Sequence, residues 1–200
     1  QLGFKGALVN GFSQVASSEN VMYYDHPAYA SFWRRAEELD VPFYLHPREP
    51  LASREPIYDG HPWLLGPVWA FAAETAVHAL RLMCSGLFDR HPRLTLILGH
   101  LGESLPFSAW RIDMCLSRGG KPSTFRDTLH SHFWITTSGN FSNPALLCCI
   151  MEMGIDRVMF AVDWPFVANK PAVQWMETVP LCDEDKAKIL SGNAQQLLRL

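Results

Sequence analysis

The chain has 200 residues, of which 48% are hydrophobic and 18% are charged, and its formal net charge is −3 at pH 7. This length suffices for one domain with a buried core, and the charge balance gives no electrostatic sign of nucleic-acid binding. No apolar run is long enough to span a membrane, and the amino terminus lacks a secretory signal pattern. We therefore expect a cytoplasmic protein with no nucleic-acid or membrane partner. Because the first residue is not Met, we expect the chain to begin inside a larger protein.

The cysteine pattern favours free thiols over disulfides. The number of cysteines is odd, and no two of them form a CxxC pair. This pattern is typical of an intracellular protein with reduced cysteines. The five are Cys84, Cys115, Cys148, Cys149 and Cys182.

Short apolar segments alternate with helical patterns along the chain. Strands are predicted at 4–10, 41–46, 93–100, 133–140 and 157–164. Helices are predicted at 29–39, 68–88, from the third strand to about 116, at 143–153, 171–178 and 183–190. A long loop separates the second strand from the helix at 68–88, whose buried side is predicted to carry Phe71, Ala72, Thr75, Ala76, Ala79, Leu80 and Met83.

This alternation predicts an α/β fold whose parallel strands are joined by helical crossovers. An open doubly wound sheet and a (β/α)₈ barrel both satisfy the pattern. The chain has no Gly-rich phosphate loop, which argues against a nucleotide-binding sheet. Five strands are too few to close a barrel of eight, so a barrel requires about three further βα units upstream.

Polar residues stand where the predicted strands end. The list is Asn10, His46, His100, Ser138, Asn140 and Asp163. Because the carboxyl ends of parallel strands meet at one rim, these side chains are expected to gather there. That rim carries the active site in such folds.

Two of these residues are candidate metal ligands. His46 presents an imidazole at a strand end, which suits Zn²⁺ or a similar divalent ion, although a hydrogen bond within the loop is the simpler interpretation. Asp163 follows the apolar run "VMFAV", where a carboxylate can bind a metal or act as an acid or base. Its simpler interpretation is the N-cap of the next turn.

His100 and Glu103 form a candidate catalytic pair in "GHLGE". A carboxylate bonded to one ring nitrogen would set the tautomer and leave the other nitrogen for chemistry. Glu103 could instead only favour the start of the next helix. Eight residues further on, Arg111 could hold a substrate carboxylate, or it could form a surface ion pair with Asp113. Glu74 and His78 are spaced i,i+4 on a helix, and a stabilising role is the simplest interpretation.

The chain resembles the amidohydrolase-related, metal-dependent decarboxylases, most closely the 2,3-dihydroxybenzoate and γ-resorcylate decarboxylases. The segments "VPFYLHPREP", "LILGHLGESLPFSAWRID", "ITTSGNF" and "RVMFAVDWPF" carry the resemblance. It implies a distorted TIM barrel of which residues 1–200 form the C-terminal part. The family's ExH or ExA motif on its first strand is absent here, in agreement with missing upstream units.

The resemblance also implies roles for individual residues. His46 and Asp163 would bind one divalent metal ion, Zn²⁺, Mg²⁺ or Mn²⁺. Asp163 would also protonate the substrate beside His100 and Glu103, with Arg111 near the substrate. The implied reaction is nonoxidative decarboxylation of a hydroxybenzoate by a homodimer or homotetramer. The γ-resorcylate enzymes have an Asn, contributed by a neighbouring subunit, at the position of Leu116. The Leu in its place favours 2,3-dihydroxybenzoate or a salicylate-like acid as the substrate here.

Two other functions stay open at this point. One is a metal-dependent hydrolase of lactone or amide bonds that uses the same rim, although no lysine ends a predicted strand as the carboxylated Lys of many hydrolases would. The other is a non-catalytic domain or an inactive fragment, because five strands leave unpaired edges.

Overall fold

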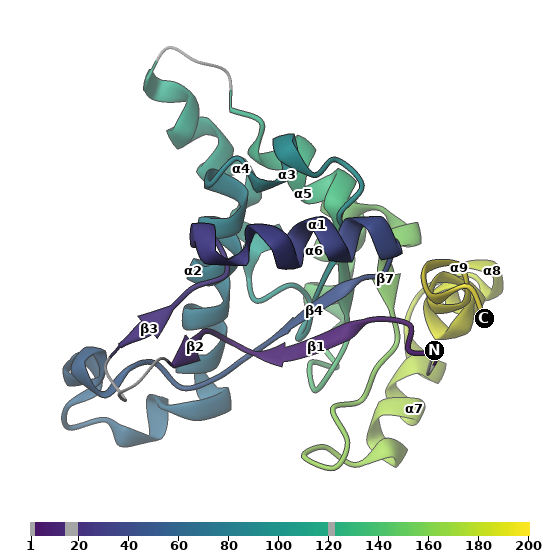
Figure 1. Ribbon diagram of the computed structural model, residues 1–200. Coiled ribbons are helices and arrows are strands. Elements are labelled where there is room, and N and C mark those ends of the chain that lie inside the picture. Colours follow the sequence, from purple (N-terminus) through teal and green to yellow (C-terminus); the bar gives the residue numbers. More distant parts are fainter. Residues whose placement is uncertain (1–2, 15–19, 120–122) are drawn as a thin grey trace.

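The computed structural model describes residues 3–14, 20–119 and 123–200 (Figure 1). These residues contain a five-stranded sheet in the order β1 (Ala7–Asn10), β4 (Phe43–His46), β5 (Leu96–Leu98), β6 (Phe133–Thr136) and β7 (Val158–Met159). Every neighbouring pair is parallel. The spatial order follows the chain without the reversal of a doubly wound sheet. The expected parallel α/β fold is confirmed, and the strand order is that of consecutive strands in a β/α barrel.

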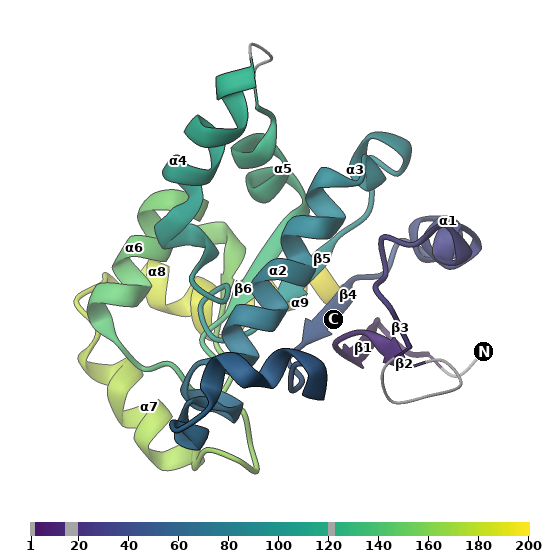
Figure 2. The ribbon, with the colours of Figure 1, turned by 90° about the vertical axis from the view of Figure 1, so that its left-hand side faces the viewer.

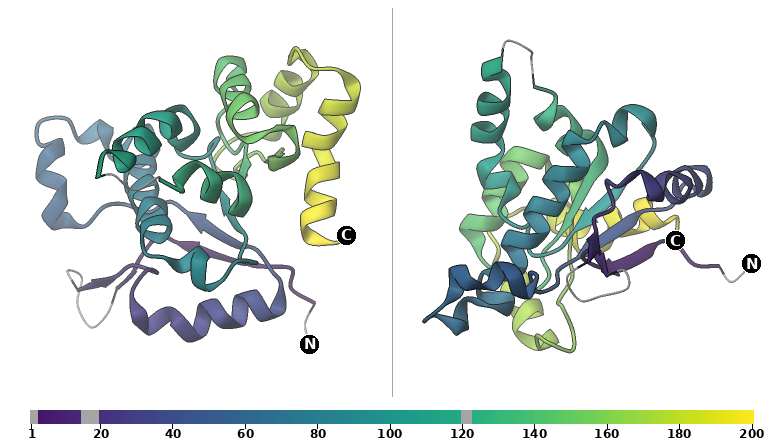
Figure 3. Two further views of the ribbon diagram at one scale, coloured as in Figure 1. Left: turned by 90° about the horizontal axis from the view of Figure 1, so that it is seen from above. Right: turned by 60° about the vertical axis from the view of Figure 1, so that its left-hand side comes forward.

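Helices lie along the outer side of the curved sheet (Figures 2 and 3), except the last of them, which packs against the inner face. They are α1 (Ala30–Leu39), α2 (Ala70–Cys84), α3 (Leu87–Arg90), α4 (Leu105–Leu116), α5 (Phe125–His132), α6 (Asn143–Met153), α7 (Asn169–Thr178), α8 (Asp183–Ala187) and α9 (Asn193–Leu198). Short 3₁₀ turns occupy much of the segment between β4 and α2, which the sequence predicted as loop. A small antiparallel ribbon of β2 (Ser13–Gln14) and β3 (Val21–Met22) follows β1 and was not predicted.

The two faces of the sheet bury different sets of residues, because side chains alternate along a strand. The outer face packs against the helices with Phe43, Leu45, Leu96, Leu98, Phe133, Ile135 and Val158. The inner face carries a second layer of Tyr44, Ile97, Trp134 and Met159, which packs against Ala194 and Leu197 of α9. Strands β4 to β7 are thus covered on both faces, as their continuous apolar sequences predict, whereas β1 at the edge of the sheet is largely exposed.

One helix prediction was wrong in its limits, and one helix was missed. The helix predicted at 68–88 is two helices, α2 and α3, separated at Gly86, which adopts a left-handed φ of 71°. A helix that continued through this residue would need a right-handed backbone, so the chain turns there. Helix α5 was not predicted at all.

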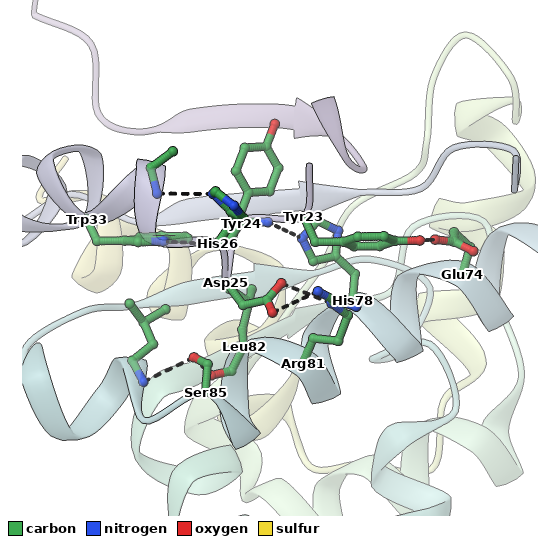
Figure 4. A network of polar contacts seen from close by, with 12 residues as sticks. Tyr23, Tyr24, Asp25, His26, Trp33, Glu74, His78, Arg81, Leu82 and Ser85 are labelled. Atoms are coloured by element: carbon green, nitrogen blue, oxygen red, sulfur yellow. Dashed lines mark hydrogen bonds and ion pairs between the residues drawn. The ribbon is translucent and has the colours of Figure 1, made fainter. Parts of the chain in front are cut away.

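The buried side of α2 also differs from the prediction. Thr75 and Ala79 are buried as predicted, but Glu74, His78 and Leu82 are buried with them and were not expected there. Figure 4 shows what covers them: the Tyr23 hydroxyl donates to Glu74, and the Tyr24 amide donates to His78 Nε2 at 3.0 Å. The segment after β3 brings these aromatic partners to the helix, and spacing within the helix gives no sign of them.

Burial of His78 predicts that acid destabilises the fold. Desolvation lowers the pKa of His78 from 6.5 to about 4. The charge of Asp25 raises this pKa slightly, and the charge of Arg81 lowers it slightly. The unfolded chain therefore binds a proton that the folded chain excludes. Stability is fully present above pH 6.5 and falls as the pH drops toward 4, by about 3 kcal/mol from this group.

Denaturant unfolding at pH 7 and pH 4.5 measures this contribution. The variant His78→Gln keeps a hydrogen-bond acceptor but does not titrate, so its stability should fall less than that of the wild type between the two pH values. Equal losses in the two proteins would contradict the assignment.

All five cysteines are free thiols, as predicted. Among the residues that the structure describes, none of the helices has the length and apolar character to cross a membrane.

Candidate active site

The carboxyl ends of the parallel strands bring the predicted residues together. The register pairs Asn10 with His46 and sets β4 beside β5. The rings of His46 and His100 lie 6.3 Å apart between centroids. His100 Nε2 is 3.7 Å from Asp163 Oδ2, although 63 positions separate the two residues in the chain. His46, His100 and Asp163, from three different strand ends, therefore face one mouth of the fold.

His100 and Glu103 form the predicted pair. The ring Nδ1 donates to Glu103 Oε1 at 2.7 Å, and Glu103 is buried with 2% of its surface exposed. Glu103 precedes α4 instead of lying in its first turn, because the chain makes a left-handed turn before the helix begins at Leu105. The hydrogen bond leaves His100 Nε2, the nitrogen that faces Asp163, for proton transfer.

The environment of the pair favours a proton held between its members. Burial raises the pKa of Glu103, while the hydrogen bond and charge of His100 oppose that change. Burial alone would lower the pKa of His100, but the hydrogen bond and charge of Glu103 and the charge of Asp163 raise it above its ordinary value. The raised pKa favours the protonated form of His100, which can pass a proton on.

Asp163 is held in an unusual backbone conformation. Its φ of 75° is left-handed, a region that only Gly, Asn and Asp enter readily. Its carbonyl accepts the amides of Phe166 and Val167 at 2.9 and 3.1 Å, so the turn is closed by the backbone. The carboxylate, which the N-cap interpretation would assign to this turn, instead faces His100.

His46 has the tautomer that a metal ligand needs. Its Nδ1 lies 3.0 Å from the carbonyl oxygen of Pro47 and donates to it, which leaves the lone pair of Nε2 free. The loop interpretation and the ligand interpretation are therefore compatible. Within residues 3–14, 20–119 and 123–200, no group of three or more His, Cys, Asp or Glu side chains is arranged to hold a metal ion. His46 and Asp163 supply two donors of the right chemistry.

Arg111 lies beside the site, in an adjoining groove. It is exposed on α4, in a groove of about 500 Å³ that Glu103, Trp69 and Leu116 also line. The predicted ion pair with Asp113 is not found in the described part of the chain, where Asp113 accepts the amide of Arg126 instead.

Sequence reasoning missed several residues around the mouth. A cavity of about 290 Å³ is lined by His100, Glu103 and Asn140 together with Pro67, Val68, Trp69 and Phe71. Pro67, Val68 and Trp69 precede α2 and Phe71 lies in its first turn, and their apolar pattern reads as ordinary helix core. Below the mouth, Thr136 and Ser138 share a hydrogen bond of 2.7 Å, and the Tyr44 hydroxyl is 3.0 Å from Thr136 Oγ1.

Comparison with known proteins assigns the chain to a family. A family model described as amidohydrolase matches residues 1–200. The chain belongs to the amidohydrolase family. Its strand-end His and Asp residues thus occupy the rim at which this fold carries its chemistry.

Relatives within the amidohydrolase family are decarboxylases. The chain is 53% identical to the γ-resorcylate decarboxylase of Rhizobium sp. (strain MTP-10005), and the match covers all of this chain and 63% of that protein. A crystal structure of 2,6-dihydroxybenzoate decarboxylase with 2,6-dihydroxybenzoate superposes with a TM-score of 0.93 at 53% identity, over 99% of this chain and 63% of the other. A dihydroxybenzoic acid decarboxylase from Polaromonas sp. JS666, with manganese and 2-nitroresorcinol, gives 0.94 at 51% identity, over 100% and 62%.

Proposed function

We propose that the protein catalyses nonoxidative decarboxylation of a hydroxybenzoate to a phenol and carbon dioxide. The observation that carries this proposal is the line of Glu103, His100 and Asp163, joined by contacts of 2.7 and 3.7 Å. It places a proton-holding pair beside an acid at the mouth of the barrel. Support comes from relatives at 50–53% identity that are γ-resorcylate decarboxylases, although the chain spans 63% of the length of the first three.

One divalent metal ion is part of the proposal. His46 Nε2 and the Asp163 carboxylate fit such an ion, since imidazole and carboxylate suit Zn²⁺ and Mn²⁺ alike. Two protein ligands fall short of the four to six that these ions take, so substrate oxygens, water or residues beyond the described ones complete the set in this proposal. When bound, the metal neutralises the substrate's charge and orients its ring. The related Polaromonas enzyme was crystallised with manganese.

The residues of this chain then perform the proton transfer. Asp163 holds a proton and delivers it to the ring carbon that bears the carboxylate, which forms a C–H bond and interrupts the aromatic ring. The C–C bond to the carboxylate then breaks, its electron pair restores the aromatic ring, and carbon dioxide leaves. His100, 3.7 Å away and charged through its bond to Glu103, returns a proton to Asp163.

The substrate is a small aromatic acid in this proposal. Two relatives at 53% identity are named γ-resorcylate (2,6-dihydroxybenzoate) decarboxylases, whereas Leu116 favours 2,3-dihydroxybenzoate or a salicylate-like acid. Both 2,6- and 2,3-dihydroxybenzoate therefore belong in the first assay. Arg111 is proposed to hold substrate near Glu103 across the groove that they share.

The remaining expectations are also proposals. We propose that residues 1–200 form the C-terminal part of a single barrel domain in a cytoplasmic homodimer or homotetramer. The exposed side chain of Leu8 on β1, at the edge of the sheet, supports pairing with further strands. Exposed Trp110 and Leu116 on α4 support a contact between subunits.

Release of carbon dioxide from carboxyl-labelled 2,6-dihydroxybenzoate and 2,3-dihydroxybenzoate tests the function. We expect labelled carbon dioxide and the corresponding phenol in equal amounts, loss of at least about 90% of the rate after exhaustive chelation, and recovery with Mn²⁺ or Zn²⁺. Formation of a new acid from a lactone or amide, without carbon dioxide, would instead identify a hydrolase. A rate indifferent to chelation would remove the metal from the proposal.

A further inference from the structure

The segment that joins β5 to α4 has a rare backbone conformation. His100, Leu101, Gly102, Glu103 and Ser104 are consecutive and all have left-handed φ angles, of 49°, 57°, 77°, 53° and 66°. Non-glycine residues enter this region singly, at a cost in free energy, and seldom in runs. A run of five persists only where the surrounding structure holds it in place.

This turn brings the catalytic pair together. It sets His100 and Glu103, three residues apart, on the same side, with Nδ1 and Oε1 at 2.7 Å. Gly102 lies between them, and a Cβ there would stand 2.9 Å from Pro106 Cδ and 3.1 Å from Ile135 Cγ2. The turn is therefore packed closely against the next strand and the next helix.

Leu101 is the residue through which the neighbouring βα unit holds the turn. Its amide donates to the carbonyl of Thr136, the last residue of β6, at 2.8 Å. Its carbonyl accepts the Cys149 thiol of α6 at 3.4 Å. Its side chain is 3% exposed and belongs to the main hydrophobic core. Both backbone polar groups of Leu101 are thus bonded to β6 and α6, and its side chain is anchored in the main core.

We propose that Leu101, assisted by Cys149, is a positioning residue that maintains the left-handed turn and thereby the His100–Glu103 hydrogen bond. Its kinetic consequence rests on the function proposed above. Leu101 does not act on the substrate itself. It acts through His100, whose ring it keeps between Glu103 and Asp163.

Three leucine substitutions separate positioning from stability. Leu101→Ala keeps a Cβ, so the backbone strain is unchanged and only the anchoring side chain is lost. We expect kcat to fall about 10-fold or more with KM within about twofold. Leu101→Met restores the volume and should restore kcat to within about threefold. The control Leu129→Ala, in the same core but on α5, should lower the melting temperature comparably and leave kcat within about twofold.

Cys149 provides a second pair of variants in case Leu101→Ala does not fold. Cys149→Ser keeps a donor for the Leu101 carbonyl, and Cys149→Ala removes it, so kcat should be lower in the alanine variant. Equal kcat in these two proteins, or a kcat loss in Leu129→Ala as large as in Leu101→Ala, would overturn the proposal.

A spectroscopic measurement distinguishes failure of this proposal from failure of the proposed function. The low-field proton resonance of His100 Nδ1–H, assigned by its absence in Glu103→Gln, reports the hydrogen bond without turnover. We expect it in the wild type and in Leu101→Met, and we expect it to be lost or shifted upfield in Leu101→Ala. A resonance unchanged in Leu101→Ala would refute the positioning role, even in an active enzyme. If the wild type shows the resonance but releases no carbon dioxide, and Leu101→Ala loses the resonance, the positioning role is upheld and the decarboxylase function is refuted.

Discussion

Replacing Asp163 by Asn is expected to lower the rate of carbon dioxide release by about 10³-fold, because an amide cannot deliver the proton that the ring carbon needs. The substitution should leave the fold intact. Asp163 sits at a φ of 75°, and Asn is one of the few residues that adopt this region readily. The measurement is kcat with labelled 2,6-dihydroxybenzoate, together with the melting temperature.

A surface carboxylate supplies the control for this prediction. Asp156 pairs with Lys188 Nζ at 3.1 Å and its side chain is 67% exposed, so Asp156→Asn should change neither rate nor stability appreciably. An Asp163→Asn enzyme that retains more than about a tenth of the wild-type kcat would show that another group donates the proton.

Replacing Glu103 by Gln is expected to lower kcat by about 100-fold. The glutamine matches the shape of the glutamate but carries no charge, so the imidazolium form of His100 loses its counter-charge. The pKa of His100 then loses the rise that Glu103 causes, and proton return to Asp163 slows. The check is a comparison of kcat and KM, with a change expected mainly in kcat.

A second carboxylate–histidine pair in the fold provides a matched control. Glu152 Oε1 on α6 is 3.2 Å from His130 Nε2 on α5 and is also bonded to Arg126, and neither Glu152 nor His130 lines the cavity at the mouth. Glu152→Gln should lower the melting temperature through the loss of this ion pair and leave kcat unchanged. If Glu103→Gln retained full kcat, the role of the pair in proton return would be excluded.

The positions of the strand ends could be predicted from the sequence with few assumptions. The runs that end at His46 and His100 are continuously apolar, which is typical of strands buried on both faces. Parallel strands place their carboxyl ends at one edge, so His46, His100 and Asp163 were expected together, and the structure places them there. The roles of these residues in metal binding and catalysis stay predictions.

The buried side of α2 shows where sequence periodicity fails. A count of apolar residues selects Phe71, Ala72 and Ala76, whereas the helix buries Glu74 and His78. Polar side chains become suitable for burial when partners from elsewhere satisfy them. Tyr23 and Tyr24 are such partners, and they lie more than fifty positions away along the chain. The pattern within a helix carries no information about them.

The amino-acid sequence by itself determined the alternation of strands and helices, the apolar strands and the polar residues that end them, since these depend on neighbours within a few positions. Only the tertiary structure decided the geometry between those residues. The left-handed turn at 100–104 exists because β6 and α6 hold Leu101, and the contact of His100 with Asp163 exists because β5, β6 and β7 lie side by side. Such contacts join distant segments, and local preference, which disfavours this turn, cannot predict them.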